Sequence, residues 1–305
     1  MANSQGIISP AYTVLRSRKE FAPLFYDAYF HTDGFINHIL AKSVEGIRDG
    51  RQISYEAFKW LPIPTCDIKE QEKIANLFCV LNHRIKKQQL LVDALKKYKR
   101  GVVKSLLDPN QNQRQGVIWE TDVIGNLGTF IKGVALSKAD ISDSGTPFIL
   151  YGELYTTYKE VVRTIVKTTQ ASVDDVYLSK VGDVIIPTSG ETPEEISTAS
   201  CIMVPGVILA GDLNIYRSSI VDGRIMSYLL NHIVNDQIAR VAQGKSVVHV
   251  QASEIGKISI TYPDHNEQER IARILELIDN RIAVSEYTLN SIQKMKKALL
   301  QQLFI

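Results

Sequence analysis

A long helical segment occurs twice in this chain of 305 residues, over residues 70–107 and again over residues 267–304, at a constant offset of 197 positions. Both copies begin Glu-Gln-Glu, and both place apolar residues at alternating steps of three and four, the spacing of a coiled-coil seam. The seam residues are Ile74, Phe78, Leu81, Ile85, Val92, Leu95, Val102 and Leu106 in the first copy, and Ile271, Leu275, Ile278, Ile282, Leu289, Ile292, Leu299 and Leu303 in the second. Each amphipathic helix needs a partner for its seam, so the repeat predicts two similar modules whose helices pack together.

Polar residues interrupt the seam at equivalent positions of the two copies: Gln88 and Lys99 in the first, Ser285 and Lys296 in the second. If one copy runs antiparallel to the other, Gln88 lies opposite Ser285 at mid-length. The same alignment brings Ile74 toward Leu299 and Leu81 toward Ile292. We therefore expect the two helices to pair antiparallel.

Composition excludes several classes of protein. Hydrophobic residues make up 45% and charged residues 22% of the chain, which is ordinary for a soluble globular protein. No apolar run approaches the ~20 residues of a membrane span, and the first residues lack the features of a secretory signal. The three cysteines have no paired spacing, which argues against a disulfide framework or a zinc site. We expect a cytoplasmic protein that does not associate with membranes.

The distribution of charge along the chain does not decide which class of partner the protein binds. The net charge is only +2, yet residues 70–107 carry nine basic against three acidic residues, whereas residues 116–262 carry eleven against sixteen. A basic helix could face phosphate, although a solvated helix face is the commoner cause of such a run.

Prolines and glycines divide the rest of the chain. Strand-like segments end in proline before each long helix, at 58–64 and 258–263, and residues 108–116 read as a polar linker. Glycine-separated strands are expected at 126–131, 147–150, 181–187, 201–204 and 247–250, together with one helix at 225–242. Residues 117–263 therefore predict a compact α/β unit.

Several motifs resemble one known family. The sequence Pro-x-x-x-Glu-Gln-x-x-Ile-Ala opens the second long helix at 263–272 and, with Cys66 in place of the proline, the first helix at 66–75. Three loop motifs accompany it: Phe-Ile-Lys-Gly at 130–133, Lys-Val-Gly-Asp at 180–183 and Gly-Lys-Ser at 244–246. Together they are similar to specificity subunits of type I restriction-modification enzymes, over nearly the whole chain.

The resemblance implies a mixed α/β fold, in which globular target recognition domains with twisted mixed sheets are separated by two long antiparallel coiled-coil helices. The implied domains are a remnant of a first recognition domain (1–65), a first long helix (66–108), a linker (109–116), a second recognition domain (117–263) and a second long helix (264–305). About 38 residues at ~1.5 Å each make each helix a ruler of roughly 57 Å.

The implied function is non-catalytic and needs no cofactor. Such a subunit reads part of a bipartite sequence in double-stranded DNA and docks adenine methyltransferase (M) subunits, which restriction (R) subunits join. Only 64 residues precede the first helix, against 147 before the second, and residues 9–14 look like a mid-domain strand. We therefore expect recognition of one half-site, or of a symmetric target through a homodimer.

Candidate DNA contacts are polar or basic residues on the glycine-bounded loops, since such groups hydrogen-bond base edges or phosphates. They are Lys132, Ser137, Lys138, Thr188, Ser189, Gly190, Lys245 and Ser246, with Arg48 and Arg51 in the corresponding loop of the first unit.

The sequence leaves two alternative functional classes to compare with DNA recognition. A structural coiled-coil adaptor that binds protein and not DNA is favoured by the acidic balance of residues 116–262. An enzyme is disfavoured, because Gly244-Lys245-Ser246 lacks the earlier glycine of a phosphate loop and no amino-methyltransferase motif is present. His83, His232, His249 and His265 lack the spacing of metal ligands and have no obvious nucleophile partner.

Overall fold

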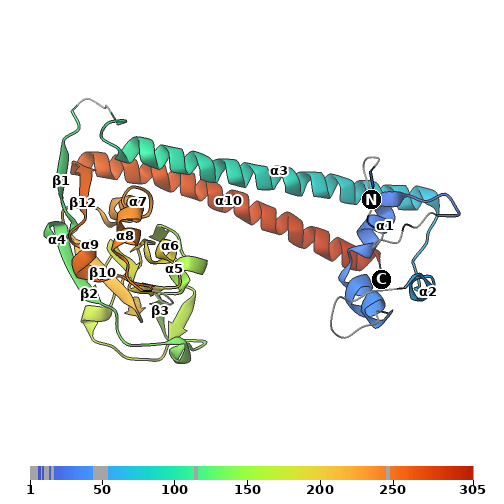
Figure 1. The fold of residues 1–305 in the computed structure, drawn as a ribbon, viewed down its shortest axis with the longest axis horizontal. Helices are drawn as coiled ribbons and strands as arrows, with labels where there is room; N and C mark the ends of the chain where they lie inside the picture. Colours follow the sequence, from blue (N-terminus) through green and yellow to red (C-terminus); the bar gives the residue numbers. More distant parts are fainter. Residues whose placement is uncertain are drawn as a thin grey trace. The chain divides into compact units, whose positions relative to one another are not determined.

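The computed structural model describes residues 6–7, 9, 14, 17–43, 54–112, 116–244 and 248–304. The chain forms two compact units: unit 1 comprises Met1–Leu95 and Arg281–Ile305, and unit 2 comprises Lys96–Asn280. Two long helices, α3 (Ile68–Leu107) and α10 (His265–Leu303), each contribute to both units (Figure 1). The mixture of helices and mixed sheets with two long antiparallel helices confirms the predicted fold class.

In unit 1, the first part of α3 packs antiparallel against the last part of α10. Leu81 and Ile292 are each 6% exposed and share one apolar cluster, which Ile74 and Leu299 join at its edge. Near Arg281, where this part of α10 begins, the Gln88 Nε2 donates a hydrogen bond of 3.0 Å to the carbonyl of Ser285. These contacts confirm the predicted register for this unit.

The seam departs from its prediction near both helix ends. Leu303 is 40% exposed, and Phe304 packs in its place, 5.1 Å from the ring of Phe25. In unit 2, Val103 and Leu107 of α3 are more deeply buried than the predicted Val102 and Leu106. There α3 packs against a globular core as well as against α10, so its buried stripe is wider than a two-helix seam.

The described residues before α3 form helices: α1 (Pro23–Phe30), the π-helix η1 (Gly34–Ile39), the 3₁₀ helix η2 (Leu40–Ser43) and α2 (Tyr55–Phe58). The strand predicted at 58–64 is wrong. Ser54 caps α2 by accepting a hydrogen bond from the amide of Ala57 (3.1 Å), and no described residue of unit 1 belongs to a strand that could pair with this segment. The strand predicted at 9–14 lies almost wholly outside the described residues.

The described part of unit 2 contains four sheets. The largest has the order β2-β10-β6-β8-β4 and is mixed, with a parallel β4–β8 pair. Its strands are β2 (Gly128–Lys132), β4 (Val161–Val162), β6 (Asp183–Pro187), β8 (Ser200–Ile202) and β10 (Leu213–Ser218). A second sheet, β5-β3-β9, comprises β3 (Thr146–Leu150), β5 (Lys167–Thr169) and β9 (Ile208–Ala210). Two antiparallel pairs complete the unit: β1 (Trp119–Val123) with β12 (Ser259–Pro263), and β7 (Ser189–Gly190) with β11 (Val248–His249).

The alternation of side chains along β6 divides the core of unit 2. Val184 and Ile186 face the cluster that contains α7 (Gly223–His232), α8 (Asn235–Val241) and the ends of the long helices, whereas Ile185 faces the cluster beneath β9. The five-stranded sheet is therefore covered on both faces. This explains why Val184, Ile185 and Ile186 of β6 are all apolar and do not alternate with polar residues.

Two element predictions for unit 2 are corrected. Residues 126–127 belong to the one-turn helix α4 (Ile124–Leu127), which buries both Ile124 and Leu127 on one face, as a strand could not. The single helix predicted at 225–242 is broken after His232. The amides of Ile233 and Val234 both bond to the carbonyl of Leu229, and the turn redirects α8 so that Val234 is buried.

The glutamine of the repeated helix-start motif performs the same task in both copies. Gln268 accepts a hydrogen bond from the amide of Asp222 (2.7 Å) and donates to the carbonyl of Pro263 (2.9 Å). Gln71 likewise accepts from the amide of Ala22 (3.0 Å) and donates to the carbonyl of Cys66 (2.9 Å). Both side chains are buried, so each ties a helix start to the segment that leads into α7 or α1.

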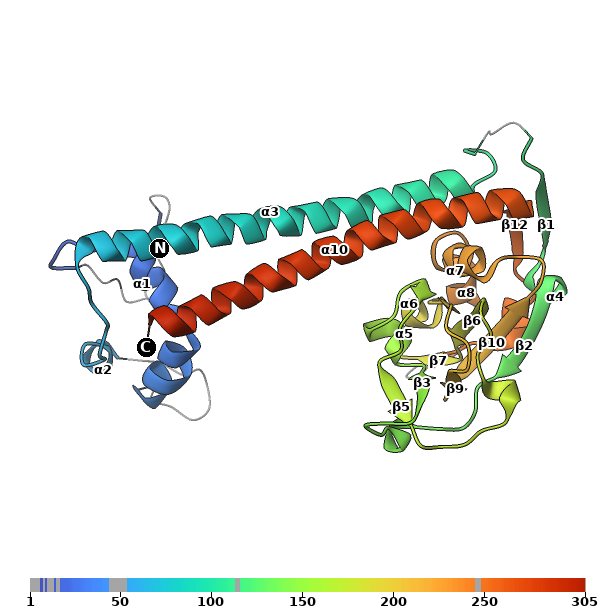
Figure 2. The ribbon, with the colours of Figure 1, turned by 180° about the vertical axis from the view of Figure 1, so that it is seen from behind.

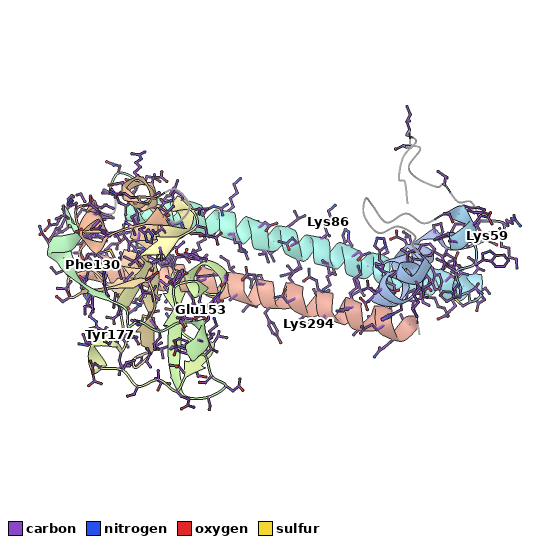
Figure 3. The ribbon with its side chains drawn as sticks, turned by 60° about the horizontal axis from the view of Figure 1, so that its bottom comes forward. Lys59, Lys86, Phe130, Glu153, Tyr177 and Lys294 are labelled. Carbon is purple, nitrogen blue, oxygen red and sulfur yellow. The ribbon has the colours of Figure 1, made fainter. Side chains whose placement is uncertain are left out.

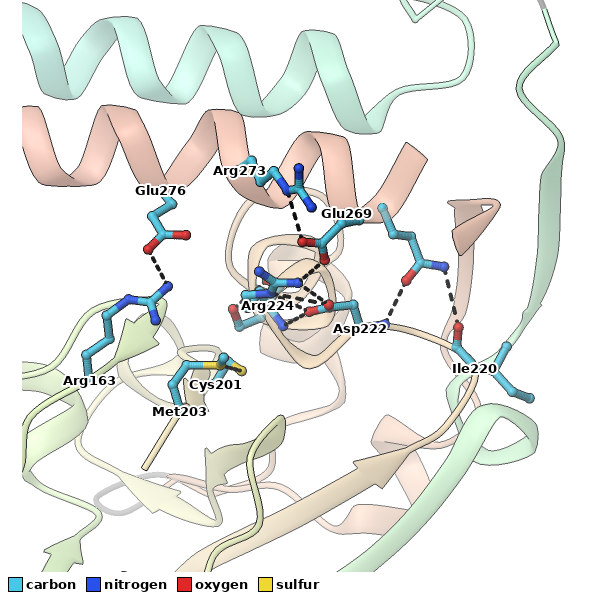
Figure 4. A network of polar contacts seen from close by, with 11 residues as sticks. Arg163, Cys201, Met203, Ile220, Asp222, Arg224, Glu269, Arg273 and Glu276 are labelled. Atoms are coloured by element: carbon cyan, nitrogen blue, oxygen red, sulfur yellow. Dashed lines mark hydrogen bonds and ion pairs between the residues drawn. The ribbon is translucent and has the colours of Figure 1, made fainter. Parts of the chain in front are cut away.

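A network of ion pairs holds α7 against α10 (Figure 4). The guanidinium of Arg224 pairs with Asp222, which caps α7, and with Glu269 of α10. Farther along α10, Glu276 pairs with Arg163 at 2.7 Å, beyond the end of β4.

Deeper in unit 2, the ammonium group of Lys99 is buried between two carboxylates, at 2.7 Å from Glu160 Oε2 and 2.6 Å from Asp279 Oδ1. His232 Nε2 lies 2.6 Å from the other oxygen of Glu160, and the hydroxyl of Tyr228 donates to Asp279. The Lys99 ammonium also lies 5.1 Å from the centre of the Tyr228 ring. One buried cation thus joins α3, α7, α10 and the start of β4.

We expect Leu81→Ala to lower the free energy of unfolding by roughly 2 to 5 kcal/mol, because it leaves a cavity in a buried seam. Urea titration followed by circular dichroism measures this. Leu90→Ala, at an exposed position of the same helix, is the matched control and should change stability little. Equal effects of the two variants would contradict the paired seam.

Glu160 should make stability depend on pH. Burial alone would raise its pKa, but the hydrogen bond with His232 and the charge of Lys99 outweigh burial and lower the pKa from 4.5 to about 2. A folded-state pKa below the unfolded value stabilises the fold above about pH 4.5, and this contribution is lost as the pH falls toward 2. Its size is on the order of 3 kcal/mol.

We therefore expect Glu160→Gln to flatten the pH dependence of unfolding between about pH 5 and pH 2. Denaturant titrations across this window provide the measurement, with Glu72→Gln at an exposed position of α3 as control. An unchanged profile for Glu160→Gln would show that this carboxylate is not stabilised in the folded state.

Candidate functional site

Unit 2 contains a cleft of about 1420 Å³ between its two larger sheets. Its walls come from the end of β2 and the loop that follows, the end of β3 with the start of α5 (Glu153–Thr156), the turn before β10, and residues 249–253. Strands β2, β3 and β10 are labelled in Figure 2, and Glu153 in Figure 3. Loops anchored on paired strands thus surround one hollow, an arrangement typical of binding sites.

Close backbone packing shapes one wall. Gly133 donates to the carbonyl of Leu213 (2.8 Å), and Gly211 donates to the carbonyl of Val134 (2.8 Å). A Cβ atom at Gly133 would lie 2.9 Å from the carbonyl oxygen of Gly211, so only glycine fits there without displacing backbone.

The loop after β2 is held by a capping box. Ser137 Oγ accepts a hydrogen bond from the amide of Ala139 (3.2 Å), and the carboxylate of Asp140 accepts one from the amide of Ser137 (2.7 Å). The resulting 3₁₀ turn, η3 (Lys138–Asp140), fixes the backbone at Lys138 on the cleft wall.

Three lysines and two carboxylates line the cleft: Lys132, Lys138, Lys167, Glu153 and Asp212. Both carboxylates have internal partners, since Glu153 accepts from the amide of Leu150 (3.0 Å) and lies 3.6 Å from Lys167 Nζ, while Asp212 accepts from the hydroxyl of Ser189 (2.7 Å). Lys132 and Lys138 are exposed and have no ion-pair partner among the described residues. The cleft therefore offers positive charge to an anionic ligand.

Asn214 of β10 lines the cleft and is only 1% exposed. Its Nδ2 has no hydrogen-bond partner among the residues that the structure describes. A buried donor without an acceptor is costly, and in native proteins it usually meets water or a ligand.

The cleft brings together four of the ten predicted contact residues: Lys132, Ser137, Lys138 and Thr188. Ser189 and Gly190 lie in β7 and are buried there, with Gly190 paired to Val248. The remaining four, Lys245, Ser246, Arg48 and Arg51, lie outside the described residues.

The structure adds polar cleft residues that sequence reasoning missed, namely Lys167, Asn214, His249 and Gln251. A sequence signal existed for Asn214, because it is a polar residue inside the otherwise apolar strand segment Leu213–Tyr216. The other three come from separate loops and strand ends, which only the folded sheets bring together.

The Lys-Val-Gly-Asp motif at 180–183 forms a structural turn. Gly182 adopts a φ of 93°, which favours glycine, and the Asp183 carboxylate accepts a hydrogen bond from the amide of Lys180 (2.8 Å). The same carboxylate pairs with Arg217 of β10 at 3.0 Å. This motif therefore fixes β6 against β10.

Among the residues that the structure describes, no group of histidine, cysteine and acidic side chains is arranged to hold a metal ion. In that part of the chain, no helix combines the length and the apolar character needed to cross a membrane.

Solved structures support the fold. The S subunit of the type I restriction-modification system from M. genitalium is 16% identical, with a TM-score of 0.63 over 92% of this chain and 72% of that one. A chain from a structure described as "Structural basis underlying complex assembly and conformational transition of the type I R-M system" is 17% identical, with a TM-score of 0.59 over 95% and 73%.

No curated protein matches the sequence significantly. A family model, the type I restriction modification DNA specificity domain, matches residues 117–294. This match spans more than half of the chain and includes every described wall of the cleft, so the chain belongs to the family of type I restriction-modification DNA specificity proteins.

Proposed function

We propose that this chain is the sequence-reading subunit of a type I restriction-modification system, and that the unit 2 cleft contacts its double-stranded DNA target. The observation that carries the proposal is the cleft itself. It joins two exposed lysines that have no ion-pair partner among the described residues to a buried amide donor, within the segment that matches the specificity family.

The cleft residues suit two roles. Exposed Lys132 and Lys138 would hold phosphates, which positions the duplex without reading it. Thr188, Asn214 and Gln251 present hydrogen-bonding groups that would read base edges, directly or through water. In this proposal the chain supplies recognition, and the chemistry belongs to its partners.

The long helices offer a surface for the methyltransferase subunits. Large apolar residues are exposed at matched positions of the repeat, in the pairs Val80 and Leu277, Leu90 and Tyr287, and Tyr98 and Met295. Single exposed apolar residues are common on protein surfaces, but their recurrence at equivalent positions of both copies favours a repeated interface. A repeated surface suits two copies of one partner, so we propose that M subunits dock here and that R subunits join them.

Recognition would involve one half-site per chain. The described part of unit 1 consists of helices and has no counterpart of the cleft-bearing sheets. A target with two equivalent halves would then require two chains, as in a homodimer.

Replacing Lys132 and Lys138 together by alanine should weaken DNA binding by the complex assembled with M subunits. Loss of two phosphate contacts should reduce the slope of log K against log salt by roughly 2. Binding is measured by fluorescence anisotropy at several salt concentrations. Lys257→Ala, an exposed lysine of unit 2 that does not line the cleft, is the control and should keep the slope.

The same experiment decides between this function and the protein-binding adaptor. If the double lysine variant binds DNA with unchanged affinity and slope, the cleft does not contact phosphate. If the assembled complex shows no sequence-dependent DNA retention at all, the adaptor hypothesis replaces the proposal.

Asn214→Leu should separate stability from recognition. The substitution is similar in volume and removes a buried donor, so the free energy of unfolding should stay the same or increase. Discrimination among target sequences should fall by roughly 1 to 3 kcal/mol at one base pair. Sequencing the adenines methylated by the assembled complex provides the readout. A strongly destabilised variant, or an unchanged motif, would contradict this role.

A further inference from the structure

Residues 157–167 connect the two larger sheets of unit 2, between which the cleft lies. This segment, which we call the strap, contains β4, the edge strand of the five-stranded sheet, and ends at the start of β5, the edge strand of the other sheet. Both ends of the strap line the cleft, at Thr157 and at Lys167. A change in the width of the cleft would therefore move the strap.

The middle of the strap is bound by charge to the long helices and to α7. One oxygen of Glu160 lies 2.7 Å from Lys99 Nζ of α3, and the other lies 2.6 Å from His232 Nε2 of α7. Three residues later, Arg163 pairs with Glu276 of α10 at 2.7 Å (Figure 4). The strap thus contacts the cleft at both ends and three helices in between.

Backbone hydrogen bonds hold the strap at only part of its length. The pairing strand β4 is two residues long. Cys201 of β8 donates to the carbonyl of Glu160 (2.8 Å). Met203, which follows β8, donates to the carbonyl of Val162 (2.9 Å). Residues 163–166 belong to no helix or strand. The ion pair of Arg163 with α10 therefore helps to determine where this part of the strap lies.

Lys167 links the strap to a ligand in the cleft. Its Nζ lies 3.6 Å from Glu153 Oε1, which is longer than the ~2.7 to 2.9 Å of a charge-assisted hydrogen bond. A phosphate that enters the cleft would compete with Glu153 for this ammonium group. Because Lys167 is only four positions after Arg163, the place of Lys167 depends on the contact of Arg163 with α10.

We propose that Arg163 and Glu276 are positioning residues for the cleft: their ion pair holds the strap so that Lys167 meets a phosphate of the bound DNA. This inference rests on the proposed function, in which the cleft binds DNA. A strap that is held in place beforehand loses less conformational freedom on binding, which increases affinity. By thermodynamic reciprocity, DNA in the cleft must then also stabilise the contact of the strap with α10.

The variant Glu276→Gln separates positioning from net charge. It removes a negative charge, so electrostatic attraction alone would strengthen binding of the DNA polyanion. Loss of the ion pair should instead weaken binding, by roughly threefold because both side chains are partly exposed. Fluorescence anisotropy measures this on the complex with saturating M subunits, using a labelled duplex with the motif that the complex methylates.

Asp236→Asn is the matched control. It also removes one negative charge from unit 2, at an exposed position of α8 that does not line the cleft. This variant should bind the duplex as tightly as the unmodified chain or more tightly. Equal weakening in both variants would contradict a role of the strap.

Reversal of the ion pair tests the contact itself. Arg163→Glu places two carboxylates together and should weaken DNA binding. Adding Glu276→Arg to this variant restores an ion pair and the net charge of the unmodified chain, so affinity should return to within about twofold. A double variant that binds as weakly as Arg163→Glu would contradict the proposed contact.

Hydrogen exchange followed by mass spectrometry tests the reciprocal effect on the full chain in the same complex. The duplex should slow exchange in residues 157–167 and 273–280 of the unmodified chain. In Glu276→Gln it should slow exchange in residues 157–167 only. The readout is the difference between free and DNA-bound protein, which a general loss of stability does not produce.

The outcomes distinguish this proposal from the function on which it rests. If the Lys132 and Lys138 double variant binds DNA weakly but Glu276→Gln binds as tightly as the unmodified chain or more tightly, the cleft binds DNA and the positioning role is wrong. If the double lysine variant binds normally, the cleft does not hold DNA, and both proposals are overturned.

Discussion

The seam on each long helix is the constraint on which the rest of the structure depends. A helix of 40 residues with one apolar face is not stable alone in water, because its stability comes from covering that face. The second copy supplies a matching face, and antiparallel pairing aligns the polar break at Gln88 with the one at Ser285. Segments of both units are attached to this pair: Gln71 and Gln268 hold the segments before α1 and α7, and Lys99 holds the start of β4 through Glu160.

The sequence was informative where structure follows from local periodicity or from a repeat. The spacing of Leu81 and Ile292 predicts the helix register, and alternation closed by proline predicts β12. Prediction failed where tertiary contacts decide. Phe58 and Trp60 alternate like a strand, but a strand needs a neighbour, and the Ser54 cap stabilises a helical turn instead. The break after His232 depends on which side chains the sheet can bury, which periodicity along one helix does not reveal.

The candidate site was predictable only where a local sequence pattern marks a loop. Glycine-bounded loops located Lys132, Lys138 and Thr188, because a loop beside a strand end must reach the surface. A glycine-bounded loop does not reveal whether a residue in it would contact DNA or stabilises the fold. Ser189 follows Thr188 directly, yet its hydroxyl donates to Asp212 inside the fold, and Asp183 of the glycine turn pairs with Arg217. Lys167 and Asn214 join the cleft through strand order, which is a long-range property.

Duplication explains why equivalent residues can carry different roles. Lys99 and Lys296 occupy the same seam position, where a lysine interrupts the apolar contact in both copies. Burial of a cation is tolerated only with compensating charge, which Glu160 and Asp279 provide in unit 2. In unit 1 Asn82 stands at the position equivalent to Asp279, and Lys296 is half-buried beside a cavity. The apolar seam therefore keeps the paired helices alike in the two copies. The surroundings of each lysine differ, because different segments pack against the helices in the two units. In unit 2 the contacts of this lysine attach the part of the unit that contains the cleft to the long helices.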